Sequence, residues 1–215
     1  YDLGCSEITI AYGMTETSPI SFQSDINDPV DVRVSTVGRI QPHCEVKIVE
    51  DDGSTCAVGQ TGELWTKGYL VMKGYWNDTE ATQSSIENGW MKTGDLATID
   101  NEGFCRIVGR KKDMVIRGGE NIYPAELEEF LTAQKGILEA HVFGIPDEKF
   151  GEQLVAWIIA EEDATIDETS IQNLCKNALA YYKVPAIVRF VKEVPLTATG
   201  KPQKFKMREI MLNET

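Results

Sequence analysis

Short apolar runs separated by turn residues dominate the first half of the chain. Four of these runs predict strands at residues 44–49, 62–66, 96–99 and 104–108. Turn-forming clusters such as Asp51-Asp52-Gly53 follow them, and a further apolar run predicts a strand at residues 8–11. Strands this short and this often interrupted favour a small antiparallel barrel or sheet.

The second half of the chain alternates helical and strand patterns instead. Pro124 can occupy the first turn of a helix whose apolar residues include Leu127 and Leu131. Asp167 can cap a later helix, in which apolar residues recur at the spacing of one helix face. Apolar runs predict strands near residues 139–145, 153–160 and 186–191. Together these elements predict a compact α+β domain of about a hundred residues.

Composition places the chain among globular proteins. Its 215 residues are 42% hydrophobic and carry a formal net charge of −13, which fits one or two domains with a proper core. No window approaches the roughly 18 uninterrupted apolar residues of a membrane-spanning helix. A strongly acidic chain repels phosphodiester backbones, so nucleic-acid binding is disfavoured.

Charge is distributed unevenly between the two halves. Residues 1–109 carry 7 basic and 17 acidic residues, whereas residues 110–215 carry 14 and 17. The basic residues form two clusters, one of Arg110, Lys111, Lys112 and Arg117 and one of Lys201, Lys204, Lys206 and Arg208. Specific anion sites and an ordinary solvated surface explain such clusters about equally well.

Cysteine and histidine offer no clear catalytic or metal site. The five cysteines form no Cys-x-x-Cys pair, so we interpret them as reduced thiols that mostly serve packing. His141 lies in the apolar run Ala140-His141-Val142-Phe143 and is expected to be a strand residue rather than a catalyst.

The segment from Ala11 to Thr17 combines an aromatic ring, a glycine, a hydroxyl and a carboxylate. The ring of Tyr12 can stack on a base, and Gly13 lets a ligand approach the backbone. The Thr15 hydroxyl can bond a phosphate, and Glu16 can hold a divalent cation. A turn at the end of a strand explains the same residues almost as well.

Three further motifs follow along the chain. Asp95 ends a turn-forming run that starts at Gly89, where a carboxylate could accept both hydroxyls of a ribose. Residues 109–124 place a cationic turn before a Gly-Gly loop, and residues 195–204 form a small-residue loop that presents Lys201. Taken singly, an ordinary turn, a linker or a surface lysine explains each motif.

Taken together and in this order, the four motifs resemble the later core motifs of the acyl-adenylate-forming enzymes. This superfamily includes acyl-CoA synthetases, adenylation domains and luciferases. Gly62-Glu63-Leu64, Gly68 and Gly74-Tyr75-Trp76 match the same pattern, so the resemblance covers essentially the whole chain. The runs at residues 118–126 and 200–206 look most like those of the animal medium-chain acyl-CoA synthetases.

The resemblance implies a fold and a reaction. Residues 1–111 would be the C-terminal part of the large AMP-binding domain, a β-rich remnant with a distorted barrel and strands. Residues 112–215 would be the small, mobile α+β C-terminal domain. The enzyme would join a fatty acid to CoA by way of an acyl-adenylate, consuming ATP with Mg²⁺ and releasing AMP and pyrophosphate. A mitochondrial location would follow from the animal type, and a cytoplasmic one otherwise.

The resemblance also implies roles for single residues. Lys201 would be catalytic, because it would bridge the carboxylate and α-phosphate oxygens during adenylation. Glu16 would bind Mg²⁺, and Lys112 would be the hinge. The residues implied to bind ATP or AMP are Tyr12, Gly13, Met14, Thr15, Asp95, Ile107, Arg110 and Lys201. Those implied to line the path of CoA are Gly118, Gly119, Glu120 and Asn121.

Two departures from the family pattern bear on activity. Pro202 stands where the family usually has an aliphatic residue, which removes an N–H donor beside Lys201. The chain also lacks the Ser/Thr/Gly-rich phosphate loop and begins like a cut end, so we expect a C-terminal fragment that is inactive by itself. A noncatalytic fragment or an adenylate-binding regulatory module is the alternative; such a module would keep Asp95 and Arg110 but would not need Lys201.

Overall fold

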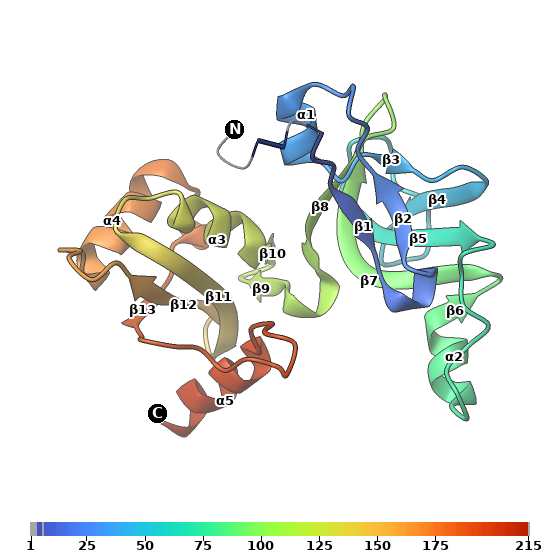
Figure 1. The fold of residues 1–215 in the computed structure, drawn as a ribbon. Helices are drawn as coiled ribbons and strands as arrows, with labels where there is room; N and C mark the ends of the chain where they lie inside the picture. Colours follow the sequence, from blue (N-terminus) through green and yellow to red (C-terminus); the bar gives the residue numbers. More distant parts are fainter. Residues whose placement is uncertain (1–3, 6, 215) are drawn as a thin grey trace. The chain divides into compact units, whose positions relative to one another are not determined.

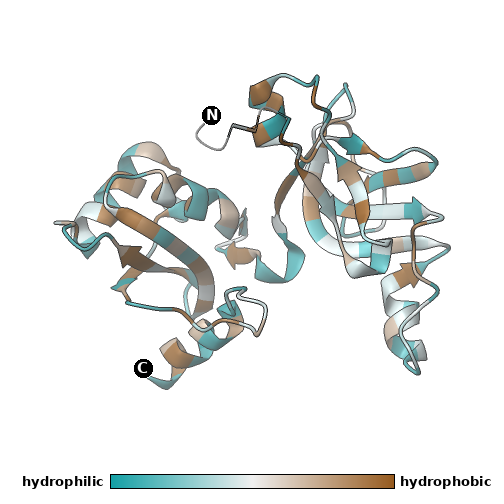
Figure 2. Cartoon of the chain, viewed as in Figure 1, coloured by the Kyte–Doolittle hydropathy of each residue, from teal (hydrophilic) through white to brown (hydrophobic). Residues whose placement is uncertain are grey.

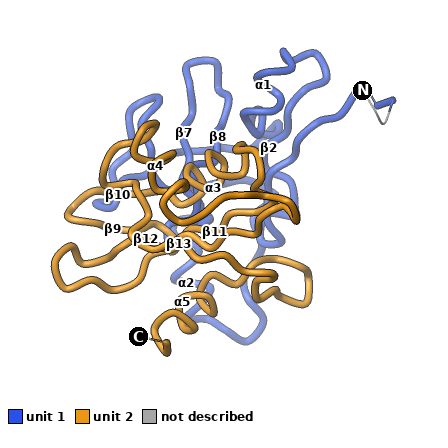
Figure 3. The backbone as a smooth tube through the Cα atoms, turned by 90° about the vertical axis from the view of Figure 1, so that its left-hand side faces the viewer, with its two compact units in different colours: residues 1–111 blue, residues 112–215 orange. Residues whose placement is uncertain are grey.

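The computed structural model describes residues 4, 5 and 7–214. The chain forms two compact units, residues 1–111 and residues 112–215, shown in separate colours in Figure 3. Each unit has its own apolar core.

Unit 1 contains two antiparallel sheets. The smaller has the strand order β1-β2-β3 and consists of β1 (Ala11–Gly13), β2 (Ile20–Gln23) and β3 (Arg39–Ile40). The larger has the order β4-β5-β7-β6, with β8 beside β7. Its strands are β4 (Cys44–Val49), β5 (Gly62–Gly68), β6 (Ile86–Glu87), β7 (Trp90–Ile99) and β8 (Cys105–Arg110). The long strand β7 bends strongly, which curls this sheet into a half-barrel (Figure 1).

Short helices complete unit 1. They are α1 (Val30–Ser35), α2 (Thr79–Ser85) and the 3₁₀ turns η1 (Thr15–Thr17) and η2 (Lys111–Asp113), the last of which continues into unit 2. The core combines side chains from both sheets, namely Phe22, Ile48, Leu64, Ala97 and Cys105. Burying the inward-facing side of each strand in this way is what the alternating apolar pattern requires.

The strands predicted at residues 44–49, 62–66 and 104–108 are confirmed. The strand predicted at residues 96–99 is the end of β7, which already begins at Trp90, so the run that leads to Asp95 is a strand and not the expected turn. The strand predicted at residues 8–11 is wrong in its bounds. The observed strand begins at Ala11 and ends at Gly13. Upstream of it, the Ile10 N–H donates to the Ser24 hydroxyl at 2.8 Å, and the Ile10 carbonyl accepts from the Ser24 N–H at 2.9 Å. Pairing at a single residue does not extend into a ladder, so the apolar run stays outside regular structure.

Unit 2 is one five-stranded sheet with helices on both faces. Its strand order is β10-β9-β12-β11, and β13 pairs parallel to β12. The strands are β9 (Val115–Arg117), β10 (Glu120–Ile122), β11 (Ile137–Asp147), β12 (Gly151–Ala160) and β13 (Ile187–Phe190). Helices α3 (Pro124–Thr132) and α4 (Glu168–Ala178) pack on one face, and α5 (Lys204–Asn213) packs on the other. A 3₁₀ turn, η3 (Tyr181–Lys183), precedes β13.

Both faces of this sheet are buried, which explains the long apolar runs in β11 and β12. Val142 and Leu154 join the core under α3 and α4, whereas Phe143 and Val155 join the core under α5. Figure 2 shows brown stretches along these two strands, interrupted by teal bands at polar residues.

The two predicted helix starts in unit 2 are confirmed. Pro124 occupies the first turn of α3. Asp167 is the N-cap of α4, where its carboxylate accepts the Ser170 N–H at 2.8 Å while the Ser170 hydroxyl accepts the Asp167 N–H at 2.9 Å. Helix α5 was not predicted, because its basic residues suggested a surface cluster and only Met207 and Met211 mark its buried side.

Other expectations from the sequence hold as well. His141 is a buried strand residue in β11, and its ring nitrogen Nε2 lies 3.1 Å from a Glu139 carboxylate oxygen. Cys44, Cys56, Cys105 and Cys175 are free thiols. The described residues include no helix long and apolar enough to cross a membrane. The fold mixes α and β structure, as predicted.

Candidate functional site

Three residues expected to bind a nucleotide meet in unit 1. Asp95 lies on β7 directly opposite Arg110, the last residue of β8. The Arg110 Nε lies 3.2 Å from Asp95 Oδ1, and the Tyr12 hydroxyl donates to Asp95 Oδ2 at 2.6 Å. The Asp95 side chain is 14% exposed and that of Arg110 is 55% exposed. Each oxygen of the carboxylate thus holds one donor and keeps further lone pairs for a ligand.

Tyr12 acts as a fixed hydrogen-bond donor in this cluster. Burial of its ring, and then the hydrogen bond to Asp95 and the negative charge of that residue, raise the pKa of the Tyr12 phenol far above its usual value. The phenol therefore remains protonated across the physiological range and always donates to Asp95.

A break in strand pairing sets the position of Asp95. The register between β5 and β7 shifts after Glu63, and Gly94 adopts a left-handed φ of 71° at this point. The Thr93 hydroxyl donates to the Leu64 carbonyl at 2.7 Å and accepts the Asp95 N–H at 3.1 Å. Thr93 is therefore a positioning residue that the sequence motif contained but did not single out.

Gly13 and Ile107 serve packing in this structure. A Cβ added to Gly13 would lie 1.7 Å from the Pro19 carbonyl oxygen, so the close approach of two backbone segments requires glycine here. Ile107 is half-buried on β8 and, like Tyr12, packs against the core of unit 1.

Met14, Thr15 and Glu16 lie at the 3₁₀ turn that follows β1. The Met14 N–H donates to the Thr17 hydroxyl at 3.2 Å, which closes the turn. Glu16 is half-buried and accepts a hydrogen bond from the Tyr75 hydroxyl at 2.9 Å. Across the part of the chain that the structure describes, no group of three or more metal-binding side chains comes together. Glu16 could instead contribute one ligand to a Mg²⁺ ion that arrives with nucleotide phosphates, which is the usual arrangement for this ion.

The residues expected to line the path of CoA form a β-hairpin in unit 2. Gly118 and Gly119 have φ values of 60° and 88° and connect Arg117 to Glu120, which pair across β9 and β10. Two consecutive residues with positive φ form the two-residue turn that best matches strand twist, which explains the glycine pair. The Gly118 N–H donates to the Phe150 carbonyl at 2.8 Å, so the turn is tied to the β11–β12 connection.

Lys201 is presented by a second tight turn in unit 2. The Thr197 N–H donates to the Lys201 carbonyl at 2.8 Å, and the Lys201 N–H donates to the Thr197 hydroxyl at 3.0 Å. Gly200 provides the left-handed φ of 79° that closes the turn. Among the described residues, no ion pair involves the exposed Lys201 side chain.

The structure also explains why proline is tolerated at position 202. Pro202 faces Leu196 in an isolated antiparallel bridge, flanked by the Thr197–Lys201 bond and by a bond from the Gln203 N–H to the Pro195 carbonyl. It occupies the position of an antiparallel pair that makes no hydrogen bonds, so its missing N–H removes nothing from the ladder.

Intramolecular partners neutralise much of the two basic clusters. Lys111 contacts Asp51 at 2.9 Å, Lys204 contacts Glu128 at 2.7 Å, and the Arg117 guanidinium donates to backbone carbonyls. The clusters as a whole are therefore not open anion sites. Lys112 lies exposed in η2, at the point where unit 2 begins.

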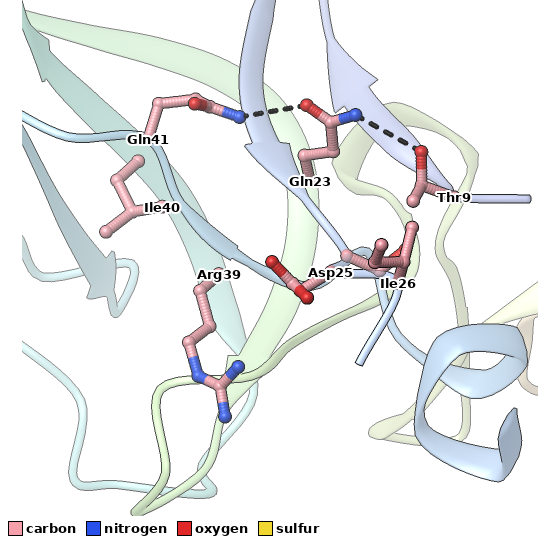
Figure 4. A pocket seen from close by; sticks show the side chains of 8 residues that line it. Thr9, Gln23, Asp25, Ile26, Arg39, Ile40 and Gln41 are labelled. Carbon is pink, nitrogen blue, oxygen red and sulfur yellow. Dashed lines mark hydrogen bonds between the residues drawn. The ribbon is translucent and has the colours of Figure 1, made fainter. Parts of the chain in front are cut away.

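A separate hollow of about 450 Å³ lies on unit 1 but contains none of the expected site residues. Figure 4 shows its lining, in which Gln41 donates to Gln23 and Gln23 donates to Thr9. Arg39 at its edge is already bonded to Asp28 at 2.9 Å and lies over the Phe104 ring. The hollow is polar, and its second charged group, the Asp25 carboxylate, likewise accepts hydrogen bonds from Asn27 within the chain.

Two family models match the chain, and curated relatives cover nearly all of it. The model for the AMP-binding enzyme family matches residues 1–76, and the model for the AMP-binding enzyme C-terminal domain matches residues 126–201. YngI of Bacillus subtilis is 50% identical over 211 residues, covering 96% of this chain and 38% of YngI. The human mitochondrial medium-chain acyl-CoA ligase ACSF2 is 43% identical over 213 residues, covering 97% of this chain and 34% of ACSF2. The chain thus spans between a third and two fifths of the length of these relatives.

Solved structures agree with these matches. ATP-bound MatB from Rhodopseudomonas palustris superposes with a TM-score of 0.88 at 36% identity, covering 94% of this chain and 40% of MatB. The o-succinylbenzoate CoA synthetase MenE from Bacillus subtilis, in complex with the acyl-adenylate OSB-AMP, gives a TM-score of 0.87 at 36% identity, covering 94% and 41%. With the two family models matched in chain order, the chain belongs to the AMP-binding enzyme family, that of the acyl-adenylate-forming enzymes.

Proposed function

We propose that this chain carries the nucleotide-binding and catalytic residues of an acid–CoA ligase. The reaction joins a carboxylic acid to ATP, giving acyl-AMP and pyrophosphate, and CoA then displaces AMP to form the thioester. The observation that carries the proposal is the Asp95 carboxylate, held between the Tyr12 phenol and the Arg110 guanidinium with lone pairs to spare. Such a carboxylate is suited to accept the two ribose hydroxyls of an adenylate.

The other residues of unit 1 would complete the nucleotide site. The Tyr12 ring and the Gly13–Met14 backbone would border the adenine, with Ile107 beneath it. Arg110 would contact the ribose and the phosphate from its exposed side. The Thr15 hydroxyl would contact phosphate, and Glu16 would bind the Mg²⁺ that accompanies ATP. Mg²⁺ would supply charge neutralisation on the phosphates, as bound Mg²⁺ does in phosphoryl transfer.

Lys201 would perform the chemical role in the first step. Its exposed ammonium is available to contact the oxygens that lie between the attacking carboxylate and the α-phosphate. Charge that develops there in the transition state is stabilised by a fixed cation in a water-excluded site, an effect worth roughly 3 kcal/mol or more. Pro202 supports this role because it stiffens the turn without removing a hydrogen bond.

The second step would use the glycine hairpin of unit 2. We propose that the two units are the end of the large AMP-binding domain and the mobile C-terminal domain, with Lys112 as the hinge between them. The turn at Gly118 and Gly119, with Glu120 and Asn121, would line the path of the CoA thiol. Hinge motions of this kind need a few residues at the end of an element, and Lys112 lies in the short η2 turn.

The names of the animal relatives support a proposal for the substrate and for the cellular compartment. The ACSF2 proteins carry "medium-chain acyl-CoA ligase" and "mitochondrial" in their names. We propose a medium-chain fatty acid as the substrate and the mitochondrion as the compartment on this support.

The test measures the first half-reaction in a hybrid enzyme, in which residues 1–215 replace the matching segment of YngI. Asp95→Ala should lower pyrophosphate release with ATP and octanoate by about a hundredfold, because a lost contact in the transition state costs about 10²–10³ in rate. Asp31→Ala, which changes an exposed aspartate on α1, is the matched control and should leave the rate unchanged. Equal rates for the two variants would contradict the proposal.

A further inference from the structure

Tyr75 links two motifs that the proposed reaction treats separately. Its hydroxyl donates to Glu16 Oε1 at 2.9 Å, across 59 positions of sequence. The backbone just before Tyr75 also holds Glu16, since the Met72 N–H donates to the Glu16 carbonyl at 2.9 Å. Glu16, the expected metal ligand, is thus held by one hydrogen bond to its main chain and by another to one of its carboxylate oxygens.

Helix α2 in turn holds Tyr75. The Tyr75 N–H donates to the Thr82 hydroxyl at 2.9 Å, and that hydroxyl donates to the Asp78 carbonyl at 2.7 Å. Gly74 precedes it with a φ of 150°, and a Cβ there would lie 2.8 Å from the Thr82 side chain. The Asp78 carboxylate caps the helix by accepting the Ala81 N–H. The tyrosine is therefore anchored on a capped helix and is not a freely moving surface residue.

The arrangement leaves the other oxygen of Glu16 for a ligand. Among the hydrogen bonds of the described residues, none reaches Glu16 Oε2. The phenol of Tyr75 donates its hydrogen bond to Oε1 and so occupies that oxygen. A carboxylate that binds metal is commonly oriented by a hydrogen bond of this kind to its second oxygen.

We propose that Tyr75 is a positioning residue for Glu16, turning Oε2 toward the Mg²⁺ that accompanies ATP. The proposal rests on the proposed function and assigns a role to the Gly74-Tyr75-Trp76 motif. Tyr75 acts only through Glu16, so it affects ligands that bring Mg²⁺ and leaves ligands without the metal untouched. Binding of MgATP depends on Tyr75, whereas binding of AMP does not.

The experiment measures binding of MgATP and of AMP to the hybrid with YngI by calorimetry, without turnover. Tyr75→Phe should weaken MgATP binding about tenfold, the lower end of what lost outer-sphere partners cost in metal affinity, and should leave AMP binding within twofold. Glu16→Gln should weaken MgATP binding at least as much. In the Glu16→Gln background, Tyr75→Phe should add no further loss. Tyr69→Phe removes an exposed phenol and is the matched control.

The outcomes distinguish the metal role of Glu16 from the positioning role of Tyr75. MgATP binding that is unaffected by Glu16→Gln would overturn the metal role within the proposed function. A loss with Glu16→Gln but none with Tyr75→Phe would overturn the positioning role alone, as would equal losses for MgATP and AMP. In the 215-residue chain, urea unfolding of the two single variants and the double variant provides a measurement that needs no ligand. Strictly additive effects there would show that the two side chains do not interact, which also overturns the proposal.

Discussion

The two units hold their expected functional residues in different ways. In unit 1 the side chains bond to one another: Asp95 holds Tyr12 and Arg110, and Glu16 holds Tyr75. In unit 2 the turn that carries Lys201 is fixed by backbone bonds, and its ammonium has no ion-pair partner among the described residues. A preorganised cluster of side chains and a presented lysine suit the two steps of the reaction proposed above. Substitutions at these sites should therefore affect both stability and ligand binding or rate in the first unit, whereas Lys201→Ala in the second unit should affect the chemistry alone.

The largest expected effect is on chemistry and comes from Lys201→Ala. In the hybrid with YngI, this change should lower acyl-AMP formation by about 10³-fold because the transition state loses its fixed cation. Thioester formation from supplied acyl-AMP should be spared, as should the urea midpoint. Lys206→Ala on α5, whose ammonium lies over the Phe205 ring, is the control. Equal loss of acyl-AMP formation and of thioester formation would show that Lys201 does not act in the first step alone.

Gly13→Ala should have the largest effect on stability. The added methyl group would meet the Pro19 carbonyl oxygen at 1.7 Å, and overpacking against backbone costs about 3 kcal/mol. Urea unfolding of the 215-residue chain measures this loss. Gly109→Ala places the same methyl group where nothing lies within 4 Å, so it should change stability by less than about 0.5 kcal/mol. Similar losses of stability for Gly13→Ala and Gly109→Ala would show that the Gly13 backbone does not lie as close to Pro19 as described.

Tyr12→Phe should have an intermediate effect. It removes the phenol that bonds Asp95 at 2.6 Å, and a hydrogen bond to a charged group contributes about 1.5–3 kcal/mol to stability. Unit 1 should unfold at lower urea, and AMP binding should weaken because Asp95 loses one of the two groups that orient it. A variant as stable as the unsubstituted chain would show that the bond from Tyr12 to Asp95 does not preorganise this cluster of side chains.

The smallest expected effect concerns acid stability in unit 2. The Ser170 N–H, and then its side chain, hold the pKa of Asp167 below its usual value. Asp167 therefore stabilises the fold above its unfolded pKa of about 4, and this contribution is lost as the pH falls through the lower folded value. Asp167→Asn keeps the helix cap but cannot titrate, so less stability should be lost between about pH 5 and pH 3. Asp163→Asn, in an exposed turn, is the control, and parallel pH curves for both would contradict the assignment.

Local patterns predicted much of the fold because local chemistry determines it. The Asp167 cap, the proline start of α3 and the strands between turns depend on neighbours in sequence. The strand predicted at residues 8–11 begins only at Ala11 because a strand needs a partner, and the backbone bond from Ser24 to Ile10 does not continue into a ladder. Helix α5 was missed because its few buried residues become apparent only against the β11–β12 sheet.

In the candidate site, too, local sequence patterns identified single residues but not the partners that hold them. The motifs identified Asp95, Arg110 and Glu16, but the partners that fix them lie far away in sequence. Tyr75 is 59 positions from Glu16, and the Tyr12 hydroxyl reaches Asp95 across 83 positions. The N–H donor that Pro202 lacks likewise proved unnecessary once the structure showed which neighbouring N–H groups are bonded.

Asp95 is proposed to hold the ribose of an adenylate, and a titration of the 215-residue chain with AMP and with 2′,3′-dideoxy-AMP, followed by amide shifts in NMR spectra, tests this directly. AMP should bind at least tenfold more tightly and should shift the amides near Tyr12, Asp95 and Arg110. Asp95→Ala should abolish the difference between the two ligands. Equal affinity for both ligands in the unsubstituted chain, or shifts confined to other residues, would contradict this role of Asp95.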